Sequence, residues 1–193
     1  MIFKSKEEIR NFVWNEMKKN GICKFPCFGH IPNFKDVERT IEKIIGLEEY
    51  KNSKRIFISP DSPQRILIKF AIKEKEIYMA TPKLKNGFCK VKIFGNLYEI
   101  LKNSEKIFEI PKIDFALIGS VAVDLKGNRI GKGSGYGDRE IKILREKNKN
   151  VIVATNVHEI QVFEDFSYLM KEHDEKVNII ITPKRVIKLF NNF

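Results

Sequence analysis

The sequence predicts an α/β fold, a single three-layer domain over residues 1–193 with a largely parallel sheet and a glycine-rich loop. In the second half of the chain, short apolar runs alternate with amphipathic helical segments, which is typical of strands joined by helices. The 193 residues are 42% hydrophobic, enough apolar material for one core. We find no internal repeat, linker or low-complexity tract that would divide the chain.

The first half begins with a predicted helix. Ser5 and Glu8 form a capping box, apolar residues follow at helical spacing, and Gly21 ends the helix. A proline-containing loop follows, and a second amphipathic helix begins near Asp36. Further along, the pattern predicts strands over 55–58, 66–72 and 77–80, a loop over 82–87 and a helix over 96–104.

The second half contains the clearest strand signal. Residues 115–123 are almost continuously apolar, as expected of a strand buried on both faces. Gly127 and Asn128 mark a tight turn. We expect helices over 138–147 and 164–171, the latter capped near His173 and Asp174, strands over 151–154, 160–163 and 177–182, and a last helix after Pro183.

The charge of the chain is strongly positive and unevenly distributed. The net charge is +11, and residues 51–95 hold eleven Lys and Arg against three Asp and Glu. Such a surplus attracts anionic partners, namely nucleotide phosphates, polycarboxylate tails or nucleic acid, although a solvated lysine-rich face is an equal alternative. No run approaches the ~20 apolar residues of a membrane span, and the first residues lack a signal-peptide pattern. We therefore expect a cytoplasmic protein without a membrane partner; its oligomeric state is left open.

The three cysteines, Cys23, Cys27 and Cys89, are expected to be reduced thiols. Cys23, Cys27 and His30 offer three of the four ligands that a structural zinc site needs, and no second ligand group is visible. An ordinary irregular loop is the expected structure there.

The most informative segment reads NRIGKGSGYGDR, over residues 128–139. Its four alternating glycines cost conformational entropy and bury no side chain, so core packing does not explain them. They suit a close approach of the backbone to an anion at the start of a helix, where free N–H groups and basic side chains stabilise negative charge. The spacing fits neither the Walker loop nor the dinucleotide fingerprint. We interpret the segment as a phosphate-binding loop, against the alternative of a tight crossover without a ligand.

With Gly119–Asp124 before it, this loop resembles the R-L-G-x-G-K-G-Y-Y-D-R motif of the 5-formyltetrahydrofolate cyclo-ligase family, also called methenyltetrahydrofolate synthetase. The similarity is greater to a divergent branch, the methenyltetrahydrofolate-synthetase-domain-containing proteins. The segments shared with that branch are Ile31–Phe34, Thr81–Leu84, Val157–His158 and Thr182–Pro183.

The resemblance implies a reaction that uses ATP and Mg²⁺. ATP phosphorylates the formyl oxygen of 5-formyltetrahydrofolate, the neighbouring nitrogen attacks, and phosphate leaves from the 5,10-methenyl product. Such chemistry needs positioning and cationic stabilisation more than a side-chain nucleophile. The residues expected at the nucleotide are Lys4, Lys6, Arg10, Arg129, Gly131, Lys132, Gly133, Ser134, Gly135, Tyr136, Gly137, Asp138 and Arg139; Lys132, Tyr136 and Arg139 are expected to be catalytic, and Asp138 and Asn178 to bind the metal.

Three positions depart from the family motif. Ser134 replaces the lysine of G-K-G, Gly137 replaces the second tyrosine, and Asn178 replaces a carboxylate near the end of the chain. Each loss predicts weaker Mg-ATP handling. The sequence therefore leaves three hypotheses open: a cyclo-ligase acting on a folate or related reduced pterin with altered activity, a catalytically degenerate nucleotide-binding module, and an RNA-associated protein that uses residues 51–95.

Overall fold

The computed structural model describes residues 2–24 and 26–189. Within them, a central eight-stranded sheet has the order β13-β12-β10-β7-β3-β4-β5-β6. The four strands β12, β10, β7 and β3 are mutually parallel, as is β4 beside β3, and the edge strands are antiparallel. The expected largely parallel sheet is confirmed. The bounds are β3 Arg55–Ile58, β4 Glu76–Ala80, β5 Phe88–Lys90, β6 Glu105–Ile107, β7 Phe115–Leu117, β10 Ile152–Asn156, β12 Ile179–Ile181 and β13 Val186–Lys188.

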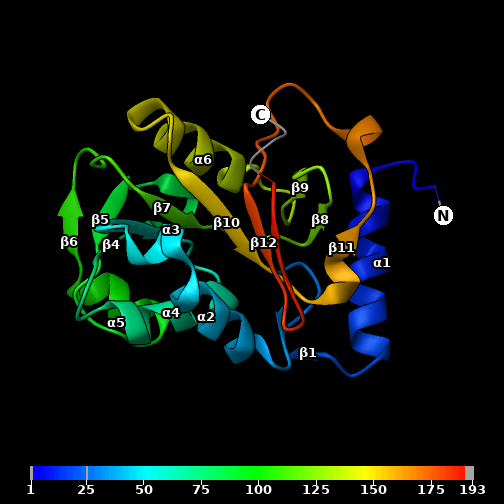
Figure 1. Cartoon of the computed structure of the whole chain (residues 1–193), viewed down its shortest axis with the longest axis horizontal. Coiled ribbons are helices and arrows are strands. Elements are labelled where there is room, and N and C mark those ends of the chain that lie inside the picture. The colour runs from blue at the N-terminus through cyan, green and yellow to red at the C-terminus, as the bar shows by residue number, and fades with distance from the viewer. Residues whose placement is uncertain (1, 25, 190–193) are drawn as a thin grey trace.

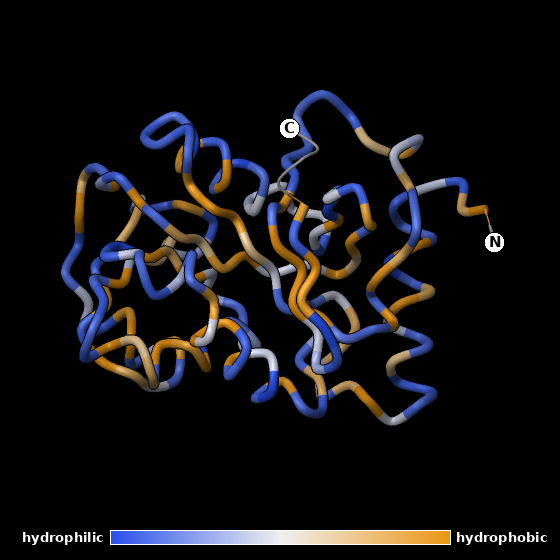
Figure 2. The backbone as a smooth tube through the Cα atoms, in the orientation of Figure 1, coloured by the Kyte–Doolittle hydropathy of each residue, from blue (hydrophilic) through white to orange (hydrophobic). Residues whose placement is uncertain are grey.

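Helices cover both faces of this sheet (Figure 1). Neighbouring strand residues point to opposite faces, so that Ile56 and Ile58 pack with one set of helices and Phe57 packs on the other side. The first face is covered by α2 Val37–Gly46, α3 Glu48–Lys51, α4 Ser62–Ala71 and α5 Leu97–Asn103, and the second by α6 Tyr136–Lys147. In Figure 2 the sheet strands are largely hydrophobic, whereas the connecting loops are largely polar.

A smaller unit packs beside the main sheet. Helix α1 Lys6–Lys19 buries Ile9, Val13 and Met17 against a three-stranded sheet of order β11-β8-β9. These strands are β8 Ala122–Asp124, β9 Arg129–Ile130 and β11 Val162–Phe163, and β1 Cys23–Lys24 with β2 Asn33–Phe34 forms a short hairpin nearby. Short 3-10 helices lie at Pro82–Leu84, Glu159–Gln161 and Ser167–Leu169.

Two predicted strands have a different structure. Of the predicted strand 66–72, residues 66–71 belong to helix α4, because the buried positions Pro63, Gln64, Leu67, Ile68 and Ala71 follow the helical period. The β-branched isoleucines of this segment are what suggested a strand. The apolar run 115–123 is divided between β7 and β8, which lie in two different sheets, and the break includes Gly119.

Two predicted helices are wrong. Over 164–171 the structure has only the 3-10 turn at Ser167–Leu169, so the expected capping role of His173 and Asp174 does not arise. After Pro183 the chain forms β13, because the Thr182 N–H donates to the Arg185 carbonyl (2.8 Å) and closes a hairpin with β12. The part of that predicted helix over 190–193 lies outside the described residues.

The expectation of reduced cysteines is also corrected. Cys23 and Cys27 are joined by a disulfide, with their Cα atoms 6.0 Å apart; Cys89 is free and buried. Across the described ranges, no helix is long and apolar enough to cross a membrane.

Candidate functional site

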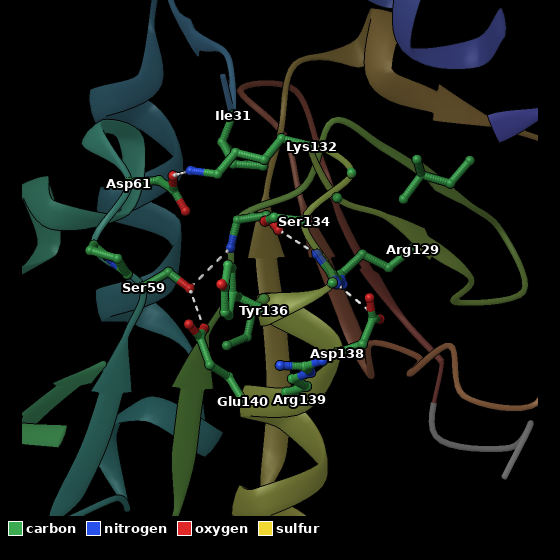
Figure 3. Close-up of a pocket in the computed structure, with 18 of the residues that line it drawn as sticks. Ile31, Ser59, Asp61, Arg129, Lys132, Ser134, Tyr136, Asp138, Arg139 and Glu140 are labelled. Carbon is green, nitrogen blue, oxygen red and sulfur yellow. Dashed lines mark hydrogen bonds and ion pairs between the residues drawn. The ribbon is translucent and has the colours of Figure 1, made fainter. Parts of the chain in front are cut away.

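A cavity of about 890 Å³ lies where the carboxyl ends of β3 and β7 meet the glycine-rich loop (Figure 3). Ligands of α/β sheets commonly bind at this edge. The wall includes Ser59, Asp61 and Gly119, which follow the two strands, and the segment from Arg129 to Glu140. Lys6 and Arg10 of α1 complete it on the side of the smaller unit.

The glycine-rich loop presents its backbone to this cavity. Gly133 and Gly135 have φ angles of +108° and +72°, which L-residues with a side chain rarely adopt. In the described part of the chain, no hydrogen-bond acceptor is found for the backbone N–H groups from Gly133 to Asp138. These N–H groups include the first turn of α6, whose partial positive charge favours an anion. The loop is therefore able to bind phosphate oxygens.

The other two loop glycines, Gly131 and Gly137, are required for a different reason from the predicted approach of the backbone to an anion. A Cβ atom at Gly137 would lie 2.7 Å from Nη2 of Arg129, and one at Gly131 would lie 3.1 Å from Nη1. The backbone thus approaches a protein guanidinium closely at both positions. Arg129 is only 2% exposed; it donates to the Gly119 carbonyl (2.8 Å) and pairs with Asp138 (2.9 Å).

Lys132 crosses the cavity from the loop to the opposite wall. Its Nζ lies 3.0 Å from Oδ1 of Asp61, at the start of α4 (Figure 3). The sequence places Lys132 among the residues expected at the nucleotide. In this structure its charge is paired with Asp61, a residue that the sequence analysis did not single out.

Glu140 is a second carboxyl group that sequence reasoning missed. It lies on the first turns of α6 and is 5% exposed, and the Ser59 hydroxyl donates to it at 3.5 Å. Burial, reinforced by the negative charge of Asp61, raises the pKa of Glu140 to about 8. Its position one helical turn after Tyr136, on the same face of α6, was the available signal.

The other expected residues are placed as follows. Arg10 donates from Nε to the Gly131 carbonyl (2.7 Å), so it supports the loop. Lys6 forms an ion pair with Asp174, another wall residue that the sequence did not indicate. The guanidinium of Arg139 lies 5.8 Å from the Tyr136 ring centre, and both residues line the cavity.

Two expected residues do not line the cavity, Lys4 and Asn178. The side-chain oxygen of Asn178 accepts a hydrogen bond from the Val153 N–H (2.9 Å), so it is already used within the fold. Asp138 does line the cavity; its Oδ1 pairs with Arg129 and accepts from the Glu175 N–H (3.2 Å), whereas Oδ2 has no hydrogen bond to the described residues.

The carboxylates of the cavity suit a magnesium ion that binds together with a nucleotide, and they do not suit one bound by protein ligands alone. Among the described residues, no group of three or more His, Cys, Asp or Glu could hold a metal ion. Magnesium in phosphate-transfer sites commonly uses one or two carboxylates together with phosphate oxygens and water. The free Oδ2 of Asp138, beside open loop amides, matches that arrangement.

Some bases of the segment 51–95 form contacts within the fold. Lys75 donates to the carbonyls of Tyr50, Lys51 and Ser53 at 2.6–3.0 Å. Lys90 pairs with Glu76 at 2.8 Å. These two bases therefore stabilise the fold, whereas Lys83 is a base of this segment that lines the cavity.

Comparison with known proteins agrees with this architecture. The NMR structure of Aquifex aeolicus 5,10-methenyltetrahydrofolate synthetase matches with a TM-score of 0.66 and 22% identity over 95% of this chain and 92% of that one. The Mycoplasma pneumoniae 5,10-methenyltetrahydrofolate synthetase matches with a TM-score of 0.59 and 17% identity over 91% and 97% of the two chains. These similarities confirm the fold.

Sequence comparison identifies relatives at higher identity. The methenyltetrahydrofolate synthase domain-containing protein of Bos taurus is 34% identical over 95% of this chain and 53% of its own length; that of Homo sapiens is 32% identical over the same shares. The chain spans about half the length of these curated relatives. The model of the 5-formyltetrahydrofolate cyclo-ligase family matches residues 3–183. The chain therefore belongs to the 5-formyltetrahydrofolate cyclo-ligase family.

Proposed function

We propose that this chain catalyses the ATP-dependent conversion of 5-formyltetrahydrofolate, or a related reduced pterin, to the 5,10-methenyl form. The observation that carries the proposal is the row of open backbone N–H groups from Gly133 to Asp138, which faces a cavity large enough for two small substrates. Family membership supplies the reaction class.

In the proposed reaction, the formyl oxygen attacks the γ-phosphorus of ATP and ADP leaves. The neighbouring nitrogen then attacks the activated formyl carbon and loses its proton, and inorganic phosphate departs from that carbon. The loop amides would bind phosphate oxygens, and the exposed guanidinium of Arg139 would stabilise negative charge on the transferring group. Tyr136 would form part of the wall beside it.

Magnesium, when bound with the nucleotide, would neutralise part of the negative charge of the phosphates. Asp138 is the residue we assign to hold it, through the free Oδ2. Asn178 is not assigned, because its side-chain oxygen is already hydrogen-bonded to Val153.

The departures from the family motif support altered activity. Ser134 supplies no positive charge, and Lys132 could replace that charge only by leaving Asp61. We therefore expect slow turnover compared with a chain that keeps the family lysine.

The test follows two products in one reaction. The protein is incubated with Mg-ATP and 5-formyltetrahydrofolate, singly and together, while the absorbance of the methenyl product and the release of phosphate are recorded. The proposal predicts both products in equal amounts, and only when both substrates are present. ATP hydrolysis without the folate, or no product at any enzyme concentration, would reject it.

The ion pair between Lys132 and Asp61 favours one second candidate, a nucleotide-binding module without turnover, because it removes a cation from the transfer site. This candidate predicts that Mg-ATP raises the melting temperature by mass action while neither product appears. A nucleotide shift together with product formation decides for the enzyme.

A further inference from the structure

Arg129 lies beneath the loop that we assign to the nucleotide phosphates. Its Nη1 donates to the Gly119 carbonyl at 2.8 Å, at the end of β7, and its Nη2 lies 2.9 Å from Oδ1 of Asp138 on α6. The side chain is 2% exposed, and neither its Nε nor its Nη2 makes a hydrogen bond to the described residues, so the contact with Asp138 is an ion pair. One guanidinium thus connects two walls of the cavity that come from different parts of the chain (Figure 3).

The glycines of the loop fall into two classes with respect to this guanidinium. At Gly137 a Cβ atom would lie 2.7 Å from Nη2 and 2.9 Å from Nη1 of Arg129, closer than real Cβ contacts allow. At Gly135 nothing lies within 4 Å of such an atom, and the constraint is the φ angle of +72°. Gly137 is therefore required by Arg129, and Gly135 is required by the backbone.

We propose that Arg129 is a positioning residue, which fixes the loop and Asp138 against the end of β7 rather than binding phosphate directly. This proposal rests on the proposed function, because it concerns how the nucleotide site is held. It reassigns a residue that the motif had suggested as a phosphate ligand.

Two consequences follow from the contacts. Arg129 occupies one oxygen of Asp138, so that the carboxylate offers its other oxygen in a fixed direction to a metal bound with the nucleotide. It also fixes the loop relative to Gly119, which lines the cavity at the end of β7. The separation of two bound substrates would then depend on this side chain.

The contact with Gly137 is tested by thermal unfolding without any ligand. Gly137→Ala should lower the melting temperature by ~5 °C in the wild-type background, since a clash of a kilocalorie or two has that effect in a chain of this size. In an Arg129→Met background the same change should have almost no effect. Gly135→Ala is the matched control, because its backbone strain should lower the melting temperature equally in both backgrounds.

If Arg129→Met does not fold, Arg129→Lys gives the same comparison, because lysine has no atoms at the two Nη positions. An equal effect of Gly137→Ala in both backgrounds would overturn the contact as the reason for this glycine.

The positioning role is tested by the magnesium requirement of ATP binding, measured calorimetrically on the folded variants. Arg129→Lys should raise the Mg²⁺ concentration needed for half-maximal binding about tenfold. Asp138→Asn should do the same, and the double variant should be no worse than either single one, because the two residues act together. The alternative result is an unchanged magnesium requirement together with a loss of nucleotide affinity that grows with the number of phosphates on the nucleotide. That result would show that Arg129 binds phosphate directly.

The two proposals can fail separately. A wild-type chain that binds no Mg-ATP would reject the nucleotide function and, with it, the positioning role, whereas the melting-temperature comparison would still decide the Arg129–Gly137 contact. A wild-type chain that forms product while Arg129→Lys leaves the magnesium requirement unchanged would reject the positioning role alone.

Discussion

Replacing Glu140 by glutamine should make the stability of the protein less dependent on pH. Glu140 is 5% exposed, faces Asp61 and has Ser59 as its hydrogen-bond donor. Glutamine has almost the same shape and can still accept from the Ser59 hydroxyl. The substitution therefore removes the ionisable group and leaves the packing nearly unchanged.

The magnitude follows from the pKa of this group. Burial, with the charge of Asp61, raises the pKa of Glu140 from 4.5 to about 8. The folded state therefore holds its proton above pH 4.5 while the unfolded state releases it, so the stability present below pH 4.5 is lost as the pH rises toward 8. One pKa unit corresponds to 1.36 kcal/mol, so the free energy of unfolding falls by about 5 kcal/mol over this pH range.

The assay is chemical denaturation at a series of pH values from 4.5 to 8.5. The wild type should lose stability relative to Glu140→Gln as the pH rises, with the largest difference near pH 8. Glu146→Gln, an exposed change on the same helix, is the control and should follow the wild type. Parallel curves for the wild type and Glu140→Gln would refute the claim that a buried carboxyl group lies in the cavity wall.

Three further changes test other parts of the structure. Lys75→Met removes a cation that donates to three backbone carbonyls, and should lower the free energy of unfolding by about 2 kcal/mol, measured by urea denaturation; a change below experimental error would show that water replaces these bonds at no cost. Ser134→Lys restores the lysine of the family motif and should raise the rate of methenyl product formation, measured by absorbance, whereas a fall would mean that Lys132 already supplies the needed charge. Gly133→Val forces a side chain onto a φ angle of +108° and should abolish the melting-temperature shift with Mg-ATP; an undiminished shift would place the nucleotide elsewhere.

Much of the fold could be predicted because it is determined by local patterns. The helical spacing of apolar residues after Ser5 predicts helix α1, and the short apolar run after Lys54 predicts strand β3; the structure contains both. Segment 66–72 shows the limit: its isoleucines suit a strand, yet the burial of Gln64, Leu67 and Ala71 follows a helical period set by packing on the sheet. Tertiary contacts determine the secondary structure of this segment, because its local sequence is compatible with both a strand and a helix.

Cavity-lining residues could be predicted where they are adjacent in sequence, as in the loop, or where the family resemblance indicated them, as for Lys6 and Arg10. The loop from Gly131 to Asp138 is one continuous motif, and all of it lines the cavity. Asp61 and Asp174 come from distant segments, which only the topology of the sheet brings to the same edge. Asn178 is an opposite case. The family resemblance suggested it as a metal ligand, but its side-chain oxygen already accepts a hydrogen bond from a backbone N–H.

The disulfide and the role of Arg129 could not be derived from composition. Reduced cysteines were expected because nothing in the sequence suggests export, whereas the structure brings Cys23 and Cys27 close enough to pair. Likewise, a glycine beside a phosphate and a glycine beside a guanidinium look the same in sequence. Only the coordinates separate Gly137, which contacts Arg129, from Gly135, which does not.

Amide NMR of the loop tests directly whether its backbone binds phosphate. In the ¹⁵N-labelled protein titrated with Mg-ATP, the N–H resonances of Gly133, Ser134 and Gly135 should move strongly and saturate together, because these groups would exchange water for phosphate oxygens. Binding of Mg-ATP that leaves these resonances in place, and moves others far from the cavity, would contradict a phosphate site in this loop.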